Sequence, residues 1–301
     1  MKLAGIDIGT NSTRLLIVEK DEFNFKVLSK KLLTTRLGEG VDKNNYLNEN
    51  SIKRVISALK KFKKEINKYN IDNMKIVGTS ALRDVNNSDE LINLAQDKLG
   101  FDIDIVSGLE EARLTYKGVK TDLPYNKFMI IDIGGGSTEF IWRQDDFHFK
   151  SLNIGAVRMT ERYIGDAKGK VYKKECKKIE DKTKQLLERN LKNNMKEIQA
   201  VGVGGTITTV GAVDLKLEKY ISKKIHHYKI KSEDINEISN KFKNVSYKKK
   251  KKISGLQPER ADIIIAGTII LQKIMEFFDF KNIMISENDI LLGMIAEVVN
   301  K

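Results

Sequence analysis

The sequence predicts a mixed α/β protein made of two similar domains, with a ligand cleft between them. Strand-like and helix-like patterns alternate along the 301-residue chain, which is typical of this fold class. A short motif also occurs twice, because "DIGTNST" at 7–13 and "DIGGGST" at 132–138 share five of seven residues. We therefore predict a duplicated domain, divided into 1–123 and 124–301. We leave open whether the last helix packs back on the first domain.

The first half opens with three predicted strands and continues with alternating helices and strands. Apolar residues between positions 52 and 66 have the three-and-four spacing of an amphipathic helix. A second helix ends at Gly100, and Ser107 is placed to cap a third. The predicted strands are 2–8, 12–20, 25–37, the start of 74–84 and the start of 101–108, and the first two helices are 50–69 and 87–99.

The second half repeats this opening with three more strands. Pro258 fits the first turn of a long helix, where proline is tolerated. The segment 198–213 is interpreted as a strand, a glycine turn and a helix. The other predicted strands are 127–136, 137–143, 146–155 and 281–286, and the other predicted helices are 156–163, 173–191, 258–278 and 289–300.

The composition predicts a globular protein with a reduced, cytoplasmic location. Hydrophobic residues make up 41% of the chain, and no run of about 18 apolar residues would span a membrane. The N-terminus lacks a signal-peptide layout, and the single cysteine, Cys176, has no partner for an internal disulfide.

The formal net charge of +13 has two interpretations. One is a polyanionic partner, and the other is a general drift of the composition toward lysine along the whole chain. The run 247–253, "YKKKKKI", is interpreted as solvated surface. A basic field would raise the association rate of any anionic substrate. We predict neither a nucleic acid nor a membrane as partner.

The two repeated turns are candidate phosphate sites. Glycine lets backbone N–H groups approach an anion closely, and hydroxyl side chains add donors. A plain glycine β-turn is the alternative, and the duplication favours the phosphate site. Gly204 and Gly205 form a third glycine turn that opens a helix, a further anion candidate. The candidates in the two repeats are Gly9, Thr10, Asn11 and Ser12, and Gly134, Gly135, Gly136, Ser137 and Thr138.

Three acids stand beside these turns, namely Asp7, Asp132 and Glu139. Carboxylates repel a phosphate unless a cation lies between them, and Mg²⁺ often bridges carboxylates to phosphates. Asp132 and Glu139 are therefore predicted to hold Mg²⁺. Asp7, the counterpart of Asp132, is expected to serve the same ion or to hold water. For Glu139, the alternative is an outward position on a strand.

Hydrolysis also requires a group that activates water. The segment 107–116, "SGLEEARLTY", offers Glu110 and Glu111. Ser107 and Glu110 have the spacing of a capping box, which is a structural reason for Glu110. Glu111 has no such structural reason, so it is the predicted base and Glu110 is the alternative.

Arg83 is the predicted phosphate-binding arginine. It follows a buried-looking strand, where ligands of α/β sheets tend to bind, and arginine grips phosphate with two donors. His226 and His227 are adjacent, so we do not expect them to share one face, and we interpret both as structural. Surface or salt-bridge positions are expected for Arg14, Arg36, Arg158 and Arg260.

Together these motifs resemble the exopolyphosphatase and guanosine pentaphosphate phosphatase family. The resemblance runs almost end to end through "IDIGTNSTRLLI", "GTSALRDVNN", "SGLEEARLTYKGV", "IDIGGGSTEF", "VGVGGTITT" and "ERADIIIAGTIIL". It implies two ribonuclease H-like (actin-like ATPase) domains with an interdomain cleft. The implied reaction is magnesium-dependent removal of a terminal phosphate from inorganic polyphosphate, or of the 5′ phosphate from guanosine pentaphosphate. It also implies Glu111 or Glu110 on the attacking water, Asp132 and Glu139 around the metal, and Arg83 on the phosphate chain.

The chain departs from the family pattern in two places. Longer members of the family carry further C-terminal domains, which we do not expect in this chain. We therefore do not expect this chain to have high processivity on very long polyphosphate. The closing stretch reads "SENDILLGMI" and lacks the arginine that the family often has there. Exopolyphosphatase is the leading hypothesis, and a homodimer is expected from base rates. The alternatives are a guanosine pentaphosphate 5′-phosphohydrolase, a non-catalytic polyphosphate or nucleotide sensor, and a sugar-kinase-like or acetate-kinase-like transferase.

Overall fold

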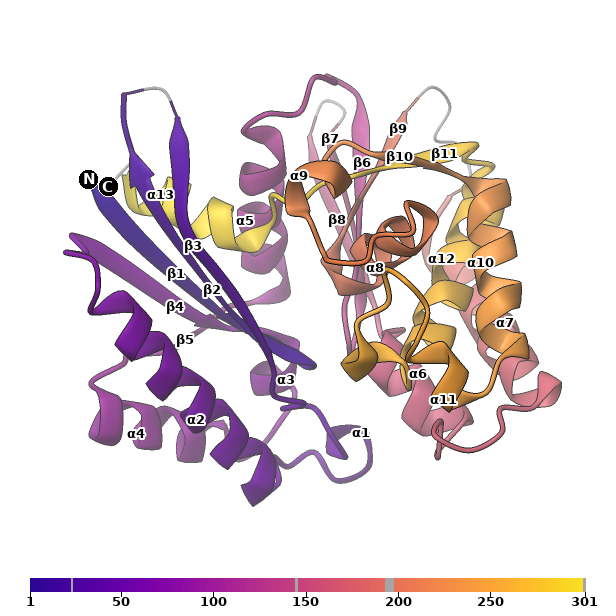
Figure 1. Ribbon diagram of the computed structural model, residues 1–301, viewed down its shortest axis with the longest axis horizontal. Helices are drawn as coiled ribbons and strands as arrows, with labels where there is room; N and C mark the ends of the chain where they lie inside the picture. The colour runs from indigo at the N-terminus through magenta and orange to yellow at the C-terminus, as the bar shows by residue number, and fades with distance from the viewer. Residues whose placement is uncertain (23, 144–145, 193–197, 300–301) are drawn as a thin grey trace. The chain divides into compact units, whose positions relative to one another are not determined.

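The contacts of the computed structural model divide the chain into two compact units (Figure 1). Unit 1 is Met1–Asp122 with Asn288–Lys301, and unit 2 is Leu123–Glu287. The last helix, α13 (Ile290–Val299), thus belongs to unit 1, and its predicted end at residue 300 lies outside the described residues. The structure describes residues 1–22, 24–143, 146–192 and 198–299.

Unit 1 contains a five-stranded sheet in the order β3-β2-β1-β4-β5. The first three strands form an antiparallel meander, and β4 and β5 continue the sheet in parallel with β1. The bounds are β1 Lys2–Ile8, β2 Ser12–Lys20, β3 Phe25–Thr34, β4 Asn73–Gly78 and β5 Asp104–Ile105.

Helices cover both faces of this sheet, which explains why β1 is apolar almost throughout. The helices are α1 Val41–Asn44, α2 Glu49–Ile66, α3 Ser80–Arg83, α4 Ser88–Leu99 and α5 Gly108–Lys120, with α13. Ile6 and Ile8 of β1 share a core with α2 and α4, whereas Leu3 shares one with α5 and α13. The backbones of α13 and α5 lie close together, because a Cβ on Gly293 would be 1.8 Å from the carbonyl oxygen of Leu114.

Unit 2 contains a six-stranded sheet in the order β10-β11-β9-β6-β7-β8. Its strands are β6 Phe128–Ile133, β7 Thr138–Arg143, β8 Phe147–Leu152, β9 Gln199–Val203, β10 Lys229–Lys231 and β11 Asn282–Ile285. Strands β6 to β8 form an antiparallel meander, and β9 and β11 run parallel to β6. Apart from the added edge strand β10, this is the strand order and direction of unit 1. The duplicated α/β fold predicted from the repeated motif is therefore confirmed.

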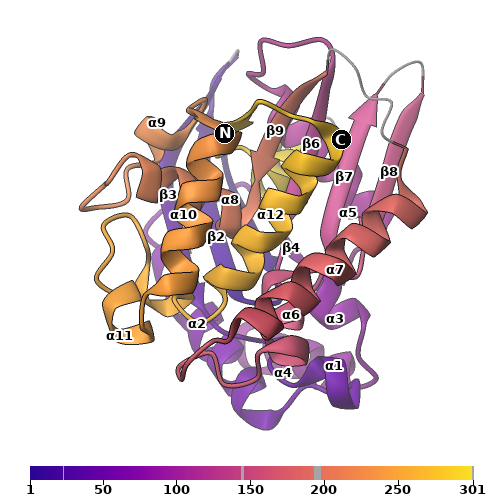
Figure 2. The same ribbon diagram turned by 90° about the vertical axis from the view of Figure 1, so that its right-hand side faces the viewer.

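The helices of unit 2 pack around α12, which Figure 2 shows running between α7 and α10. The bounds are α6 Ala156–Tyr163, α7 Lys173–Asn190, α8 Gly204–Asp214, α9 Ser222–Ile225, α10 Ser232–Asn244, α11 Tyr247–Lys250 and α12 Ile264–Phe278. The predicted start of the long helix is wrong, because Pro258–Arg260 form a separate 3₁₀ turn and α12 begins at Ile264. Among the described residues, no helix is long and apolar enough to cross a lipid bilayer.

Glu297 on α13 ties the returning helix to the rest of unit 1. Its carboxylate accepts hydrogen bonds from Lys117 of α5 at 2.9 Å and from Lys75 of β4 at 3.0 Å. The hydrogen bond from Lys117, followed by that from Lys75, holds the pKa of Glu297 below its usual value. Because the pKa in the folded state is the lower one, the pairs stabilise the fold above the unfolded pKa, and this stabilisation is lost as pH falls through the folded pKa.

We expect Glu297→Gln to lower the free energy of unfolding by about 1 kcal/mol at neutral pH. The difference from the unsubstituted protein should shrink at acidic pH, as the pH falls through the lowered folded-state pKa of Glu297. Urea titrations at neutral pH and at about pH 3.5 measure both quantities. An equal loss of stability at both pH values would show that Glu297 stabilises the helix through packing rather than charge.

Candidate active site

The two repeated turns have the same backbone geometry. In unit 1 the N–H of Gly9 donates to the carbonyl of Ser12 at 3.0 Å, and in unit 2 the N–H of Gly134 donates to the carbonyl of Ser137 at 3.0 Å. A Cβ added to either glycine would lie 3.2 Å from the carbonyl oxygen that it faces. The sequence repeat is thus a structural repeat at the level of single hydrogen bonds.

The unit 2 turn presents backbone donors that the described residues do not use. The first N–H groups of α6, from Ala156 and Val157, donate to the carbonyls of Gly134 and Gly135 at 2.9 Å. These bonds fix the orientation of the turn. Within the described chain, the N–H groups of Gly135 and Gly136 form no hydrogen bond, although Gly136 is buried. Successive unpaired amides of this kind form an anion-binding nest.

The hydroxyl of Thr138 is already used inside unit 2, so it is not a phosphate donor in this structure. It donates to the backbone carbonyl of Ile154. In unit 1 the equivalent Thr13 hydroxyl is bonded to the Thr35 hydroxyl at 2.9 Å. Thr138 is the first residue of β7 and Thr13 is the second residue of β2, and both face inward, because each is fully buried. The Thr138 part of the prediction is therefore corrected.

The position opposite the first acid carries opposite charges in the two units. In the strand register Asp7 faces Arg14 in unit 1, whereas Asp132 faces Glu139 in unit 2. The unit 1 acid is neutralised by its neighbour, since the Nε and Nη2 of Arg14 donate to Oδ2 of Asp7 at 2.8 and 2.6 Å. The unit 2 turn instead places two carboxylates side by side, which favours a bound cation there.

Arg14 also binds a second buried acid, Asp289, at the start of α13. The other oxygen of Asp289 accepts from the N–H of Leu291 at 3.0 Å. Burial would raise the pKa of Asp289, but the charge of Arg14 brings it below its usual value. Burial raises the pKa of Asp7 despite Arg14, and the Oδ1 of Asp7 is buried without a hydrogen-bond partner. The salt-bridge position expected for Arg14 is confirmed.

Glu139 is held by a hydrogen bond from the neighbouring strand β8. It is 4% exposed, and its Oε1 accepts from the hydroxyl of Ser151 on β8 at 2.7 Å. Asp132 lies against the start of α8, because a Cβ on Gly204 would be 2.5 Å from Oδ1 of Asp132. Gly204 has φ of +85°, a conformation that favours glycine. Carboxylate oxygens are the donors that Mg²⁺ prefers, so this pair fits that ion.

Arg260 lies buried at the N-terminus of α8, so the surface position, one of the two alternatives expected for it, is wrong. It is 8% exposed, and a Cβ on Gly205 would be 2.1 Å from its Nη2. Its Nε donates to Oε1 of Gln257 at 3.1 Å. A guanidinium beside a helix N-terminus creates a strongly anion-attracting position. The sequence signal that was missed is an arginine in a turn directly before the most apolar helix of the unit.

In unit 1, Arg83 and Glu111 are brought together at the carboxyl edge of the sheet. The Nη1 of Arg83 donates to Oε2 of Glu111 at 3.0 Å and to the carbonyl of Val106 at 2.9 Å. Arg83 follows β4 and Val106 follows β5, so the pair lies where ligands of such sheets bind. Among the described residues, Arg83 uses only Nη1, so its Nε and Nη2 remain as donors for a phosphate.

Glu110, at the N-terminus of α5, has a mainly structural role. Ser107 is the N-cap of α5, and its hydroxyl accepts from the N–H of Glu110 at 3.2 Å. This is one half of the capping box predicted from the sequence. Glu111, with its side chain directed to Arg83, therefore remains the better-placed candidate base.

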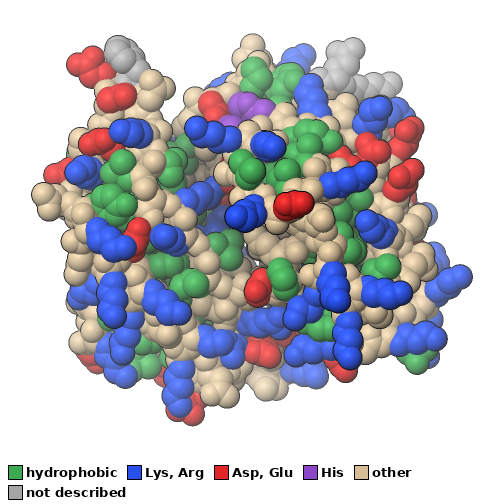
Figure 3. Space-filling model, in the orientation of Figure 1, with side chains coloured by type: hydrophobic (Ala, Val, Ile, Leu, Met, Phe, Trp, Pro, Cys, Tyr) green, Lys and Arg blue, Asp and Glu red, His purple; other side chains and the backbone are tan. Residues whose placement is uncertain are grey.

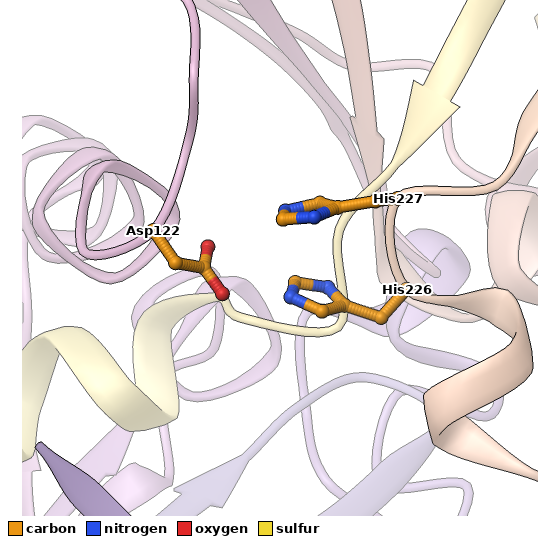
Figure 4. A group of neighbouring side chains, drawn as sticks. All are labelled: Asp122, His226 and His227. Carbon is orange, nitrogen blue, oxygen red and sulfur yellow. The ribbon is translucent and has the colours of Figure 1, made fainter.

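His226 and His227 share one face, so the expectation that they would not is wrong. Figure 4 shows the two rings stacked, and their centroids are 3.9 Å apart. The reason is the backbone, because His227 has φ of +63° and turns its side chain toward the preceding one. The Nδ1 of His226 accepts from the N–H of Glu287 at 3.1 Å, which supports a structural role.

The chain is similar to known proteins along most of its length. It is 42% identical over 313 residues to a bifunctional 3-dehydroquinate synthase/phosphatase of Fusobacterium nucleatum, covering 98% of this chain but only 46% of that protein. It is 28% identical over 311 residues to exopolyphosphatase 2 of Mycobacterium tuberculosis, covering 97% of each. The crystal structure of the Ppx/GppA family member of Aquifex aeolicus is 27% identical, with a TM-score of 0.82 over 100% of this chain and 98% of that one.

These matches confirm the fold of two ribonuclease H-like units predicted above. The model of the Ppx/GppA phosphatase family matches residues 16–301, which include the whole unit 2 meander and all the acids described here except Asp7. The chain therefore belongs to the Ppx/GppA phosphatase family.

Proposed function

We propose that the chain is an exopolyphosphatase that hydrolyses the terminal phosphate of inorganic polyphosphate with Mg²⁺. The observation that carries this proposal is the unit 2 turn, where unused backbone N–H groups stand beside two neighbouring carboxylates. The backbone amides attract a phosphate, whereas the two carboxylates repel it unless a cation lies between them and the phosphate. Further support comes from the similarity to a protein named exopolyphosphatase 2.

In this proposal Asp132 and Glu139 hold the magnesium ion. The ion would bind phosphoryl oxygens and reduce the charge that develops on them during transfer. The hydroxyl of Ser151 donates to Oε1 of Glu139 and so orients this carboxylate. Asp7 offers one buried oxygen without a hydrogen-bond partner, Oδ1, which suits a water molecule.

Each unit offers backbone amides and arginines that attract phosphate. In unit 2 the N–H groups of Gly135 and Gly136, the N-terminus of α8 and Arg260 supply positive potential. In unit 1 the turn at Gly9 to Ser12 and the unused nitrogens of Arg83 do the same. Fixed donors of this kind stabilise the transition state most, because charge on the transferred oxygens increases along the reaction.

Glu111 is the proposed general base. Its carboxylate takes a proton from the attacking water, whose oxygen then bonds to the terminal phosphorus while the bond to the bridging oxygen breaks. Arg83 holds Glu111 in place through Nη1 and leaves its other nitrogens for the phosphate. The shortened polyphosphate leaves as an anion that the arginines neutralise, and a bound Mg²⁺ would add to this effect.

Guanosine pentaphosphate is the second candidate substrate, because the matching family model covers phosphatases of both names. The cytoplasmic location and the homodimer expected from the sequence belong to the same proposal. A non-catalytic sensor remains the alternative from another class.

Phosphate release from tripolyphosphate, long-chain polyphosphate and guanosine pentaphosphate tests the proposal. We expect turnover of polyphosphate with Mg²⁺ and a loss of activity when the metal is removed with EDTA. A higher kcat/KM on guanosine pentaphosphate would assign the chain to that substrate instead. Tight binding of polyphosphate without any release of phosphate would identify a sensor and overturn the proposal.

A further inference from the structure

The lysine run in unit 2 is not uniformly solvated, as the sequence suggested. Lys250, at the end of α11, is only 1% exposed, and burial lowers its pKa to about 8, against the opposing charge of Asp262. Its long side chain therefore points into the unit, near the turn that leads into α12. Lys250 is therefore a buried residue of unit 2 and does not contribute to the charge of the surface.

The anchored Lys250 leaves its four neighbours exposed around a single turn. Lys248, Lys249, Lys251 and Lys252 are all exposed, and we call these four residues the lysine turn. Ser246 caps the turn, because its hydroxyl accepts from the N–H of Lys249 at 3.4 Å. Figure 3 shows lysine and arginine side chains gathered on the part of unit 2 where α11 lies.

No acid within the described chain neutralises the lysine turn. The stretch from Val245 to Pro258 contains no aspartate or glutamate. Elsewhere on the surface, exposed lysines such as Lys53, Lys177 and Lys281 are each paired with a carboxylate. The lysine turn thus concentrates positive charge, whereas many other surface lysines have a nearby counter-charge.

The segment that carries the lysine turn packs on the helix of the phosphate site. A Cβ on Gly255 would lie 2.2 Å from the carbonyl oxygen of Ala212 in α8, so the chain after the turn touches the backbone of that helix. The same segment then reaches Arg260, which lies against Gly205 at the N-terminus of α8. The lysine turn and the anion-binding end of α8 are therefore joined by one short, packed segment of unit 2.

We propose that the lysine turn binds the distal part of an inorganic polyphosphate chain whose terminal phosphate occupies the catalytic residues. This inference rests on the proposed exopolyphosphatase function. Each internal phosphate carries a negative charge, so a long chain reaches four additional ammonium groups, whereas tripolyphosphate or a nucleotide is too short to do so. Binding of this kind releases counterions, which makes it strongly dependent on salt. The lysine turn would thus select substrates by length.

The test compares two variants that each remove four positive charges. One replaces the lysine turn, as K248Q/K249Q/K251Q/K252Q. The control replaces four exposed lysines of α2 and α4 in unit 1, as K60Q/K61Q/K64Q/K98Q. The KM for long-chain polyphosphate and for tripolyphosphate is measured for both variants and the unsubstituted protein, at about 50 and about 200 mM salt.

For the lysine-turn variant, we expect the salt dependence of the KM for long-chain polyphosphate to weaken. The slope of log KM against log salt should fall by about 3, using about 0.7 per phosphate contact for a single strand, which is roughly a 50-fold change over this salt range. The KM for tripolyphosphate and the kcat should stay within about twofold. The control variant should keep most of the original slope.

Equal changes in the two variants would overturn the proposal, because they would show a general effect of net charge. An unchanged slope in the lysine-turn variant would overturn it as well. Binding of long-chain polyphosphate to each protein is also measured directly. This measurement tests the contact with the lysine turn even if the protein does not hydrolyse polyphosphate, so failure of this inference can be told apart from failure of the proposed function. If single-stranded nucleic acid bound as tightly with the same salt slope, the turn would be a general polyanion site and the assignment to polyphosphate would fail.

Discussion

Replacing Glu111 by Gln is expected to lower the rate of phosphate release from polyphosphate by about 10²–10⁴. Glutamine has the size and shape of glutamate but cannot take a proton from water. The KM should change little, because Arg83 loses one ion pair and keeps its donors for the phosphate. Steady-state kinetics with tripolyphosphate measure both parameters.

Glu110→Gln is the matched control for this experiment. The two acids are adjacent on the first turn of α5, and both substitutions remove one negative charge. Glu110 takes part in the helix cap through its N–H, which the substitution leaves in place. We expect Glu110→Gln to retain activity within about fivefold. If Glu110→Gln were the inactive variant and Glu111→Gln the active one, the two roles would be exchanged.

Replacing Arg14 by Met is expected to lower the free energy of unfolding by about 3–5 kcal/mol at neutral pH. Arg14 is the shared partner of two buried acids, Asp7 and Asp289, which are 4% and 8% exposed. Without the guanidinium both carboxylates would remain buried and lose their main counter-charge. The loss would also loosen the start of α13, where the N–H of Leu291 donates to Oδ1 of Asp289.

The triple variant D7N/R14M/D289N tests whether charge is the cause. It removes the cation together with both acids, so no uncompensated buried charge remains, and it should recover most of the stability lost in Arg14→Met. Burial without Arg14 would raise both carboxyl pKa values above their unfolded values, so the loss in the single variant should become smaller as pH falls toward about 5. Denaturant unfolding at two pH values measures this. A loss below about 1 kcal/mol at neutral pH, or no recovery in the triple variant, would contradict the explanation.

The local structure of both turns could be predicted from the sequence. The repeat "DIG…ST" specifies a strand, a glycine turn and a second strand, and both copies form the same Gly-to-Ser hydrogen bond. The charge difference that follows the motif, Arg14 in one copy and Glu139 in the other, is also visible in the sequence. Its meaning required the strand register, which sets each of these residues opposite an aspartate.

The positions of long, charged side chains could not be predicted in this way. Arg260 was expected at the surface or in a salt bridge and is buried against Gly205, and Lys250 was expected in solvent and is buried near Asp262. Both residues have flexible side chains that reach either solvent or core from the same backbone position. Which of the two they reach depends on segments that are distant in the sequence.

The sequence by itself determined the duplicated α/β architecture, the two glycine turns and the acids beside them, because periodicity, turn chemistry and residue type act over a few neighbouring positions. Only the tertiary structure decided which charges meet, such as Arg14 with Asp289 across 275 positions of the chain. It likewise decided that α13 returns to unit 1. The physical reason is that an ion pair or a buried cation is stable only when remote segments together exclude water from it, and no local pattern encodes that exclusion.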